Sequence, residues 1–64
     1  MKNFKIGDEV IFRNIFSLLS GRISKCHKWG YSIKTVDSAF TIVTYEVSVN
    51  DVIRTVRSLN ELAL

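Results

Sequence analysis

The stretch on which the fold depends is Phe40-Thr41-Ile42-Val43-Thr44-Tyr45-Glu46-Val47-Ser48-Val49, the longest β-forming run in the chain. Side chains of a strand alternate between its two faces, so every second residue from Val43 to Val49 shares one apolar face. Thr44, Glu46 and Ser48 fall on the other face, which predicts a half-buried strand. Phe40 and Ile42 also lie on that second face. We therefore expect the first half of the strand to contact apolar neighbours on both sides, as a strand in a small barrel does.

Turn-forming residues divide the rest of the chain into shorter strands. In the first predicted strand, Val10 and Phe12 share a face and are assigned to the core. In the second, Ile23 points inward, and Gly30 in the turn that follows is free to adopt a positive φ. Residues 50–51 predict a tight turn or one turn of 3₁₀ helix. The predicted strands cover about residues 9–13, 21–27, 31–36, 40–49 and 52–56, with turns at 7–8, 28–30 and 37–39.

Residues 14–20 break the alternation because apolar side chains follow one another closely. Two interpretations remain open, a loop folded over one end of the barrel or a single helical turn. If the cluster is exposed, it predicts a protein interface or a contact between copies of the chain. If it is buried, it plugs the open end of the barrel. The cluster consists of Ile11, Ile15, Phe16, Leu18 and Leu19.

Length and composition predict one domain spanning residues 1–64, with a core at about 5–56 and a tail at 57–64. A hydrophobic content of 47% argues against disorder. Ser58 and Glu61 have the spacing that caps a helix start, so the tail is expected to be a short helical turn or to lack regular structure. No run of 18 apolar residues is present, and we expect a soluble, cytoplasmic protein without a membrane segment.

The order of these elements resembles the small SH3-like barrels of Tudor, KOW and related bacterial or phage modules. The resemblance rests on Gly7-Asp8-Glu9-Val10, Ser20-Gly21-Arg22-Ile23, Tyr31-Ser32-Ile33 and Tyr45-Glu46-Val47, followed by Asn50-Asp51-Val52-Ile53. It covers about residues 5–56 and implies an all-β, five-stranded SH3-like barrel. Such barrels bind peptides, protein surfaces or nucleic acids through their loops and strands, so the resemblance implies a binding module more than any one activity.

A distant similarity in layout links the chain to the type II dihydrofolate reductases, short SH3-like chains that act as tetramers. Their pore is lined by a V-Q-I-Y run, and the matching positions here are Ile42-Val43-Thr44-Tyr45. The tyrosine is kept, but Val43 stands where the glutamine would be. This departure removes the amide that such a site uses to hold its ligands, so the enzyme is only a remote alternative.

Basic and aromatic side chains gather on the predicted hairpin between the second and third strands. Nine Lys and Arg against six Asp and Glu give the chain a net charge of +3. Basic groups can neutralise phosphates, and an aromatic ring at the turn can stack on a base. The alternative is a solvated hairpin whose tryptophan packs on the edge of the barrel. The candidate nucleic-acid-binding residues are Arg22, Lys25, His27, Lys28, Trp29, Tyr31 and Lys34.

A cysteine beside a histidine, as at Cys26 and His27, could serve as a nucleophile with its base. Adjacent side chains on a strand point to opposite faces, however, so these two cannot easily form a hydrogen-bonded pair. Cys26 is instead expected to be a small half-buried hydrophobe. One Cys and one His in the chain cannot complete a zinc site, so neither a metal nor a cofactor is predicted.

The sequence therefore predicts a non-enzymatic binding module, a small phage or bacterial accessory protein that recognises a protein partner or another copy of itself. Nucleic-acid binding through the basic hairpin is the alternative. The predicted protein-binding residues are Ile15, Phe16, Leu18, Leu19 and Trp29.

Overall fold

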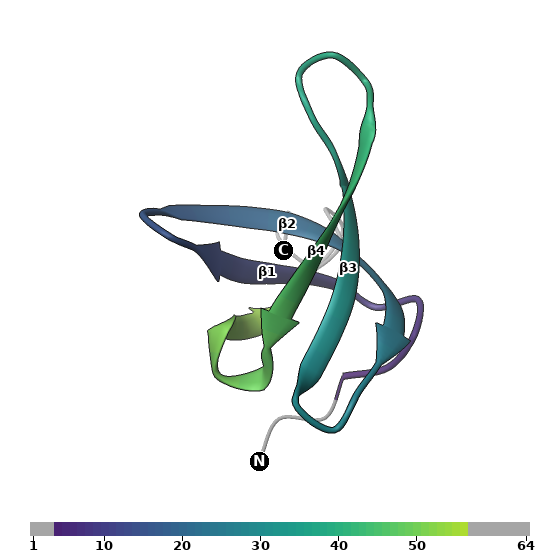
Figure 1. The fold of residues 1–64 in the computed structure, drawn as a ribbon, viewed down its shortest axis with the longest axis vertical. Helices are drawn as coiled ribbons and strands as arrows, with labels where there is room; N and C mark the ends of the chain where they lie inside the picture. Colours follow the sequence, from purple (N-terminus) through teal and green to yellow (C-terminus); the bar gives the residue numbers. More distant parts are fainter. Residues whose placement is uncertain (1–3, 57–64) are drawn as a thin grey trace, which may run out of the picture.

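Five antiparallel strands and one turn of 3₁₀ helix make up the computed structural model, which describes residues 4–56 (Figure 1). The all-β prediction with five strands is confirmed, and so is the 3₁₀ alternative for the turn before the last strand. The elements are β1 (Glu9–Asn14), β2 (Ser17–Cys26), β3 (Gly30–Val36), β4 (Ile42–Ser48), η1 (Val49–Asp51) and β5 (Val52–Thr55).

The strands form one sheet in the order β4-β3-β2-β1-β5. Within residues 4–56, β4 and β5 are the two edges and do not pair with each other, so the sheet is not closed into a barrel. The first four strands form a meander because each hairpin connection is short enough for antiparallel pairing. The turn η1 then carries the chain to β5, which pairs with β1.

All five strands contribute side chains to the core. Phe12 and Ile33 are fully buried, and the rings of Phe12 and Tyr45 lie 5.6 Å apart. Each fully buried aliphatic or aromatic side chain contributes about 1.5–3 kcal/mol relative to an exposed one. The predicted core positions Val10, Phe12, Ile23 and Val47 are confirmed. The buried apolar residues are Val10, Phe12, Ile23, Tyr31, Ile33, Val47 and Val52, and Phe4, Leu19 and Tyr45 pack against them.

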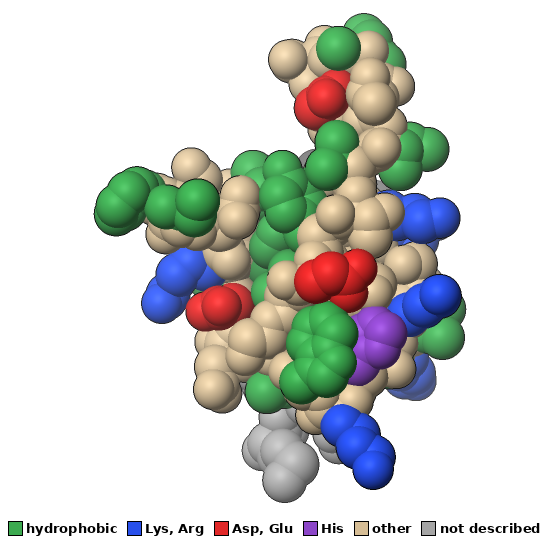
Figure 2. Space-filling view, in the orientation of Figure 1, with side chains coloured by type: hydrophobic (Ala, Val, Ile, Leu, Met, Phe, Trp, Pro, Cys, Tyr) green, Lys and Arg blue, Asp and Glu red, His purple; other side chains and the backbone are tan. Residues whose placement is uncertain are grey.

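Two hairpins extend from this core in different directions. Figure 1 shows the β1–β2 hairpin reaching to one side and the β3–β4 hairpin reaching upward. The two longest dimensions of the molecule are accordingly almost equal, 35 and 34 Å, while the third is 23 Å. In the space-filling view (Figure 2), apolar side chains gather at the end of the β1–β2 hairpin, while the end of the β3–β4 hairpin shows apolar, acidic and other side chains together. The ends of the two hairpins are therefore separate surfaces.

The prediction of a loop or helical turn at residues 14–20 is wrong. Strand β1 continues to Asn14, and β2 starts at Ser17, its cross-strand partner. Only Ile15 and Phe16 form the turn, and Ile15 has a φ of 54°, the sign that two-residue hairpin turns require at their first position. With so short a turn, the β-forming leucines that follow can pair at once with β1.

The organising strand is shorter at both ends than the sequence predicts. Phe40 belongs to the turn, with a φ of 62°, and both Phe40 and Ile42 are exposed instead of contacting apolar neighbours on a second face. Val49 is half exposed and begins η1, because Ser48 caps this turn by accepting a hydrogen bond from the amide of Asn50. The predicted cap at residues 58–61 lies outside the described part of the chain.

The second strand leaves the core after Ile23, where the pairing of β2 with β3 shifts register. The side chains beyond the shift no longer alternate in step with the core. Cys26, which lies opposite Tyr31 beyond the shift, is exposed, and this corrects the expectation that it is half-buried. Gly30 does not have a positive φ, since Gly7 is the one glycine among the described residues that does.

Candidate functional site

The end of the β1–β2 hairpin presents three apolar side chains to solvent, and we call Ile15, Phe16 and Leu18 the apolar tip. Phe16 is 101% exposed, Ile15 77% and Leu18 62%. The cluster therefore does not plug an open end of the sheet. Single exposed hydrophobic residues are common on proteins, whereas three large ones at one hairpin end form a contiguous patch.

The backbone of the apolar tip is strained. Ile15 has a φ of 54°, a conformation that glycine adopts freely and that a β-branched residue rarely adopts. Such a conformation costs on the order of 1–2 kcal/mol. Since the side chain is exposed, packing within the described chain does not offset this cost. Strain held at an exposed position is a feature typical of binding surfaces.

Two of the predicted protein-binding residues do not belong to the apolar tip. Leu19 faces the other side of β2 and packs, half-buried, against the core. Trp29 lies beyond the far end of β2, in the turn to β3. Of the predicted protein-binding residues, Ile15, Phe16 and Leu18 therefore share one surface, and Trp29 belongs to another.

The basic hairpin is confirmed as a structural unit, with β2 and β3 joined by a turn at residues 27–29. Arg22 and Lys34 are direct cross-strand partners, and Arg22 also forms an exposed ion pair with Glu9 at 4.0 Å. Exposed pairs of this kind contribute little to stability. Tyr31 is buried in the core, with its ring 5.8 Å from that of Phe4, so it cannot meet a ligand on the surface.

Arg22 and Lys34 line an open groove of about 510 Å³ on the outer face of the sheet, the face opposite the core. Their two positive charges lie beside exposed apolar side chains of the β3–β4 hairpin. The carboxylate of Glu9, the ion-pair partner of Arg22, lines the same groove. It is lined by Glu9, Ser20, Gly21, Arg22, Lys34, Thr35, Val36 and Ile42.

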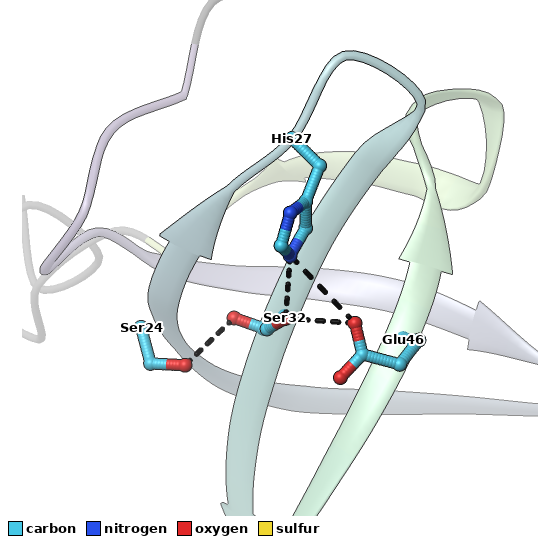
Figure 3. A network of polar contacts seen from close by, with 4 residues as sticks. All are labelled: Ser24, His27, Ser32 and Glu46. Atoms are coloured by element: carbon cyan, nitrogen blue, oxygen red, sulfur yellow. Dashed lines mark hydrogen bonds and ion pairs between the residues drawn. The ribbon is translucent and has the colours of Figure 1, made fainter.

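Trp29 is held in place by His27. The two rings are stacked almost in parallel, 4.5 Å apart and inclined by 4°. His27 is itself anchored, because its Nε2 lies 2.8 Å from the hydroxyl of Ser32 and 3.7 Å from Oε1 of Glu46 (Figure 3). The indole is 52% exposed and so offers a pre-oriented flat surface. Lys25 and Lys28, both exposed, flank His27 along the chain.

The His27, Ser32 and Glu46 cluster does not have the geometry of a catalytic triad. In a triad the histidine lies between the nucleophile and the carboxylate. Here Ser32 donates its single hydroxyl hydrogen to Glu46 at 2.7 Å, so His27 must donate to the serine oxygen. Ser32 is also buried. The network therefore orients the His27–Trp29 stack and does not activate a nucleophile.

Sequence reasoning missed the roles of Ser32, Glu46 and Phe40. Ser32 and Glu46 are cross-strand partners, and their contact depends on the register of β3 with β4, which the sequence does not give. Phe40 is 89% exposed at the end of the β3–β4 hairpin. Its left-handed backbone could not be predicted, because phenylalanine does not favour that conformation.

Comparison of the chain with protein families, with curated proteins and with solved structures found no significant match. Within residues 4–56, no helix is long and apolar enough to cross a membrane. The same residues contain no group of three or more His, Cys, Asp or Glu side chains that could hold a metal ion.

Proposed function

We propose that this chain is a protein-binding module whose apolar tip inserts into an apolar groove of a partner protein. The observation that carries the proposal is the complete exposure of Phe16 beside the strained Ile15. Burying an exposed Phe or Leu side chain in a partner is worth about 1.5–3 kcal/mol each. A few such anchors dominate the binding energy of most protein interfaces.

The fold is compatible with this role. Five antiparallel strands with a 3₁₀ turn before the last strand are the order of elements on which the SH3-like resemblance rests. We propose an SH3-like architecture, in which the loops between strands contact ligands. The β1–β2 connection then serves as a contact loop, and it is rigid because only two residues separate the paired strands.

Phe16→Ser and Leu18→Ser are expected to abolish capture of a partner from a lysate of cells that produce this chain, without changing the circular-dichroism spectrum. The matched control is Ile6→Ser, because Ile6 is 65% exposed but precedes β1 and lies outside the apolar tip. Affinity-tagged variants compared by mass spectrometry give the result. Equal capture by the wild-type, Phe16→Ser and Leu18→Ser chains would remove the proposal.

Nucleic-acid binding is the second candidate, favoured by the exposed Trp29 ring beside basic side chains. In that case nuclease treatment removes the captured material, and Trp29→Ala weakens capture more than Phe16→Ser does. Added salt also weakens binding steeply, because neutralising phosphates releases counterions. The lysate experiment with and without nuclease therefore separates the two candidates.

A further inference from the structure

The two edge strands of the sheet differ in how well they are protected from pairing with another chain. Edge strand β5 has only four residues, carries Arg54, and pairs with β1 across a register shift. Edge strand β4 has seven residues, contains no Lys, Arg or Pro, and pairs with β3 without any shift. Short length, charged side chains, proline and bulges are means by which proteins keep an edge from pairing with another chain. Strand β4 is longer than β5 and pairs without a bulge, and Glu46 is its only charged residue.

At every second residue of β4, the backbone amide and carbonyl point away from β3, toward the open edge of the sheet. The carbonyl of Thr41 accepts from the amide of Asp37, and the amide of Val49 donates to the carbonyl of Trp29, so both ends face β3. The register between them is continuous. In an antiparallel ladder this direction alternates, so the odd residues face β3, and the amides and carbonyls of Ile42, Thr44 and Glu46 face the open edge.

We propose that the open edge of β4 pairs with β4 of a second copy of this chain, antiparallel and centred on Thr44. A two-fold axis at this position places Thr44 opposite Thr44 of the second copy. The outward-facing groups of Ile42 then bond those of Glu46 in the other copy. The two sheets become one continuous ten-stranded sheet, because each copy contributes five strands. Two-fold pairing of identical patches is the commonest form of oligomer.

The side chains favour pairing centred on Thr44 over pairing centred on another residue of β4. On the core side, Val43 meets Tyr45 of the second copy, a β-branched and aromatic pair of the kind that stabilises antiparallel sheets. Both residues are half-buried in the single chain and gain cover. Centring the pair on Glu46 instead would place two carboxylates opposite each other, which is unfavourable. The Thr44 register avoids this contact.

Two cysteine variants test the register, both made with Cys26→Ser to remove the exposed native thiol. Residues in a hydrogen-bonded antiparallel pair have Cα atoms about 5.5 Å apart, within the range of a disulfide. Thr44→Cys is thus expected to form a covalent dimer on mild oxidation. Ile42→Cys, on the same strand and face, is the control, because its two copies would lie roughly 14 Å apart. Equal cross-linking by both variants would overturn the proposal.

Sedimentation equilibrium gives a second, independent test. The wild-type chain is expected to reach twice the monomer mass between micromolar and millimolar concentration. Thr44→Pro removes an outward-facing amide hydrogen without removing a bond to β3, so it is expected to stay folded and to weaken dimerisation at least tenfold. A wild-type monomer throughout that range would overturn the proposal. Phe16→Ser leaves β4 unchanged, so the dimer is expected to persist even if the apolar tip binds no partner.

Discussion

Gly30→Ala is expected to cost about 3 kcal/mol of unfolding free energy, at the upper end of the range for overpacking. A Cβ added at Gly30 would collide with the carbonyl oxygen of Val47 and lie 2.9 Å from the Cα of Ser48. Both obstacles are backbone atoms of β4, so β3 and β4 must move apart to make room. A domain of 64 residues has a total stability of roughly 3–10 kcal/mol, so the expected loss is about a third or more of the total.

Urea unfolding followed by the fluorescence of Trp29, the single tryptophan of the chain, measures this loss. Gly7→Ala is the matched control. It forces alanine into a φ of +96° but meets nothing within 4 Å, and we expect it to cost about 1 kcal/mol. If Gly30→Ala were as stable as Gly7→Ala, β3 and β4 could not approach each other as closely as the structure has them.

Phe12→Ala and Phe16→Ala are expected to differ in stability by at least about 2.5 kcal/mol, although they delete the same side chain from one hairpin. Phe12 is fully buried, and its loss removes a core side chain and leaves a cavity, which costs about 3–5 kcal/mol. Phe16 is fully exposed, and its loss is expected to change stability by less than about 0.5 kcal/mol. Thermal and urea unfolding of the two variants measure the difference. Similar losses would mean that Phe16 packs inside the molecule.

The strict alternation of apolar and polar residues was the sequence pattern that predicted the structure well. It located the core side chains Val10, Phe12 and Val47 and the number of strands, because a strand with one buried face must alternate. It failed where apolar residues are exposed. Ile15, Phe16 and Phe40 are exposed at hairpin ends, and hydrophobicity alone cannot separate a core residue from one at a tip.

Neither the strand edges nor the site network could be predicted from the sequence. Ser32 and Glu46 are 14 residues apart, and their contact depends on the register of β3 with β4. The faces taken by the last residues of β2 likewise depend on the register shift, which places Lys25 opposite Ser32 and Cys26 opposite Tyr31. A register shift of one residue moves the side chains of a strand to the opposite face of the sheet, and no local sequence pattern predicts such a shift.

Photo-cross-linking from position 16 is the measurement that tests the binding role of the apolar tip most directly. A benzophenone amino acid replaces Phe16 in one chain and Ser38, exposed at the end of the other hairpin, in a control chain. Irradiation in cells that produce this chain is expected to join one distinct protein to position 16 and not to position 38. The absence of a protein adduct at position 16, or the same adducts from both positions, would contradict the account.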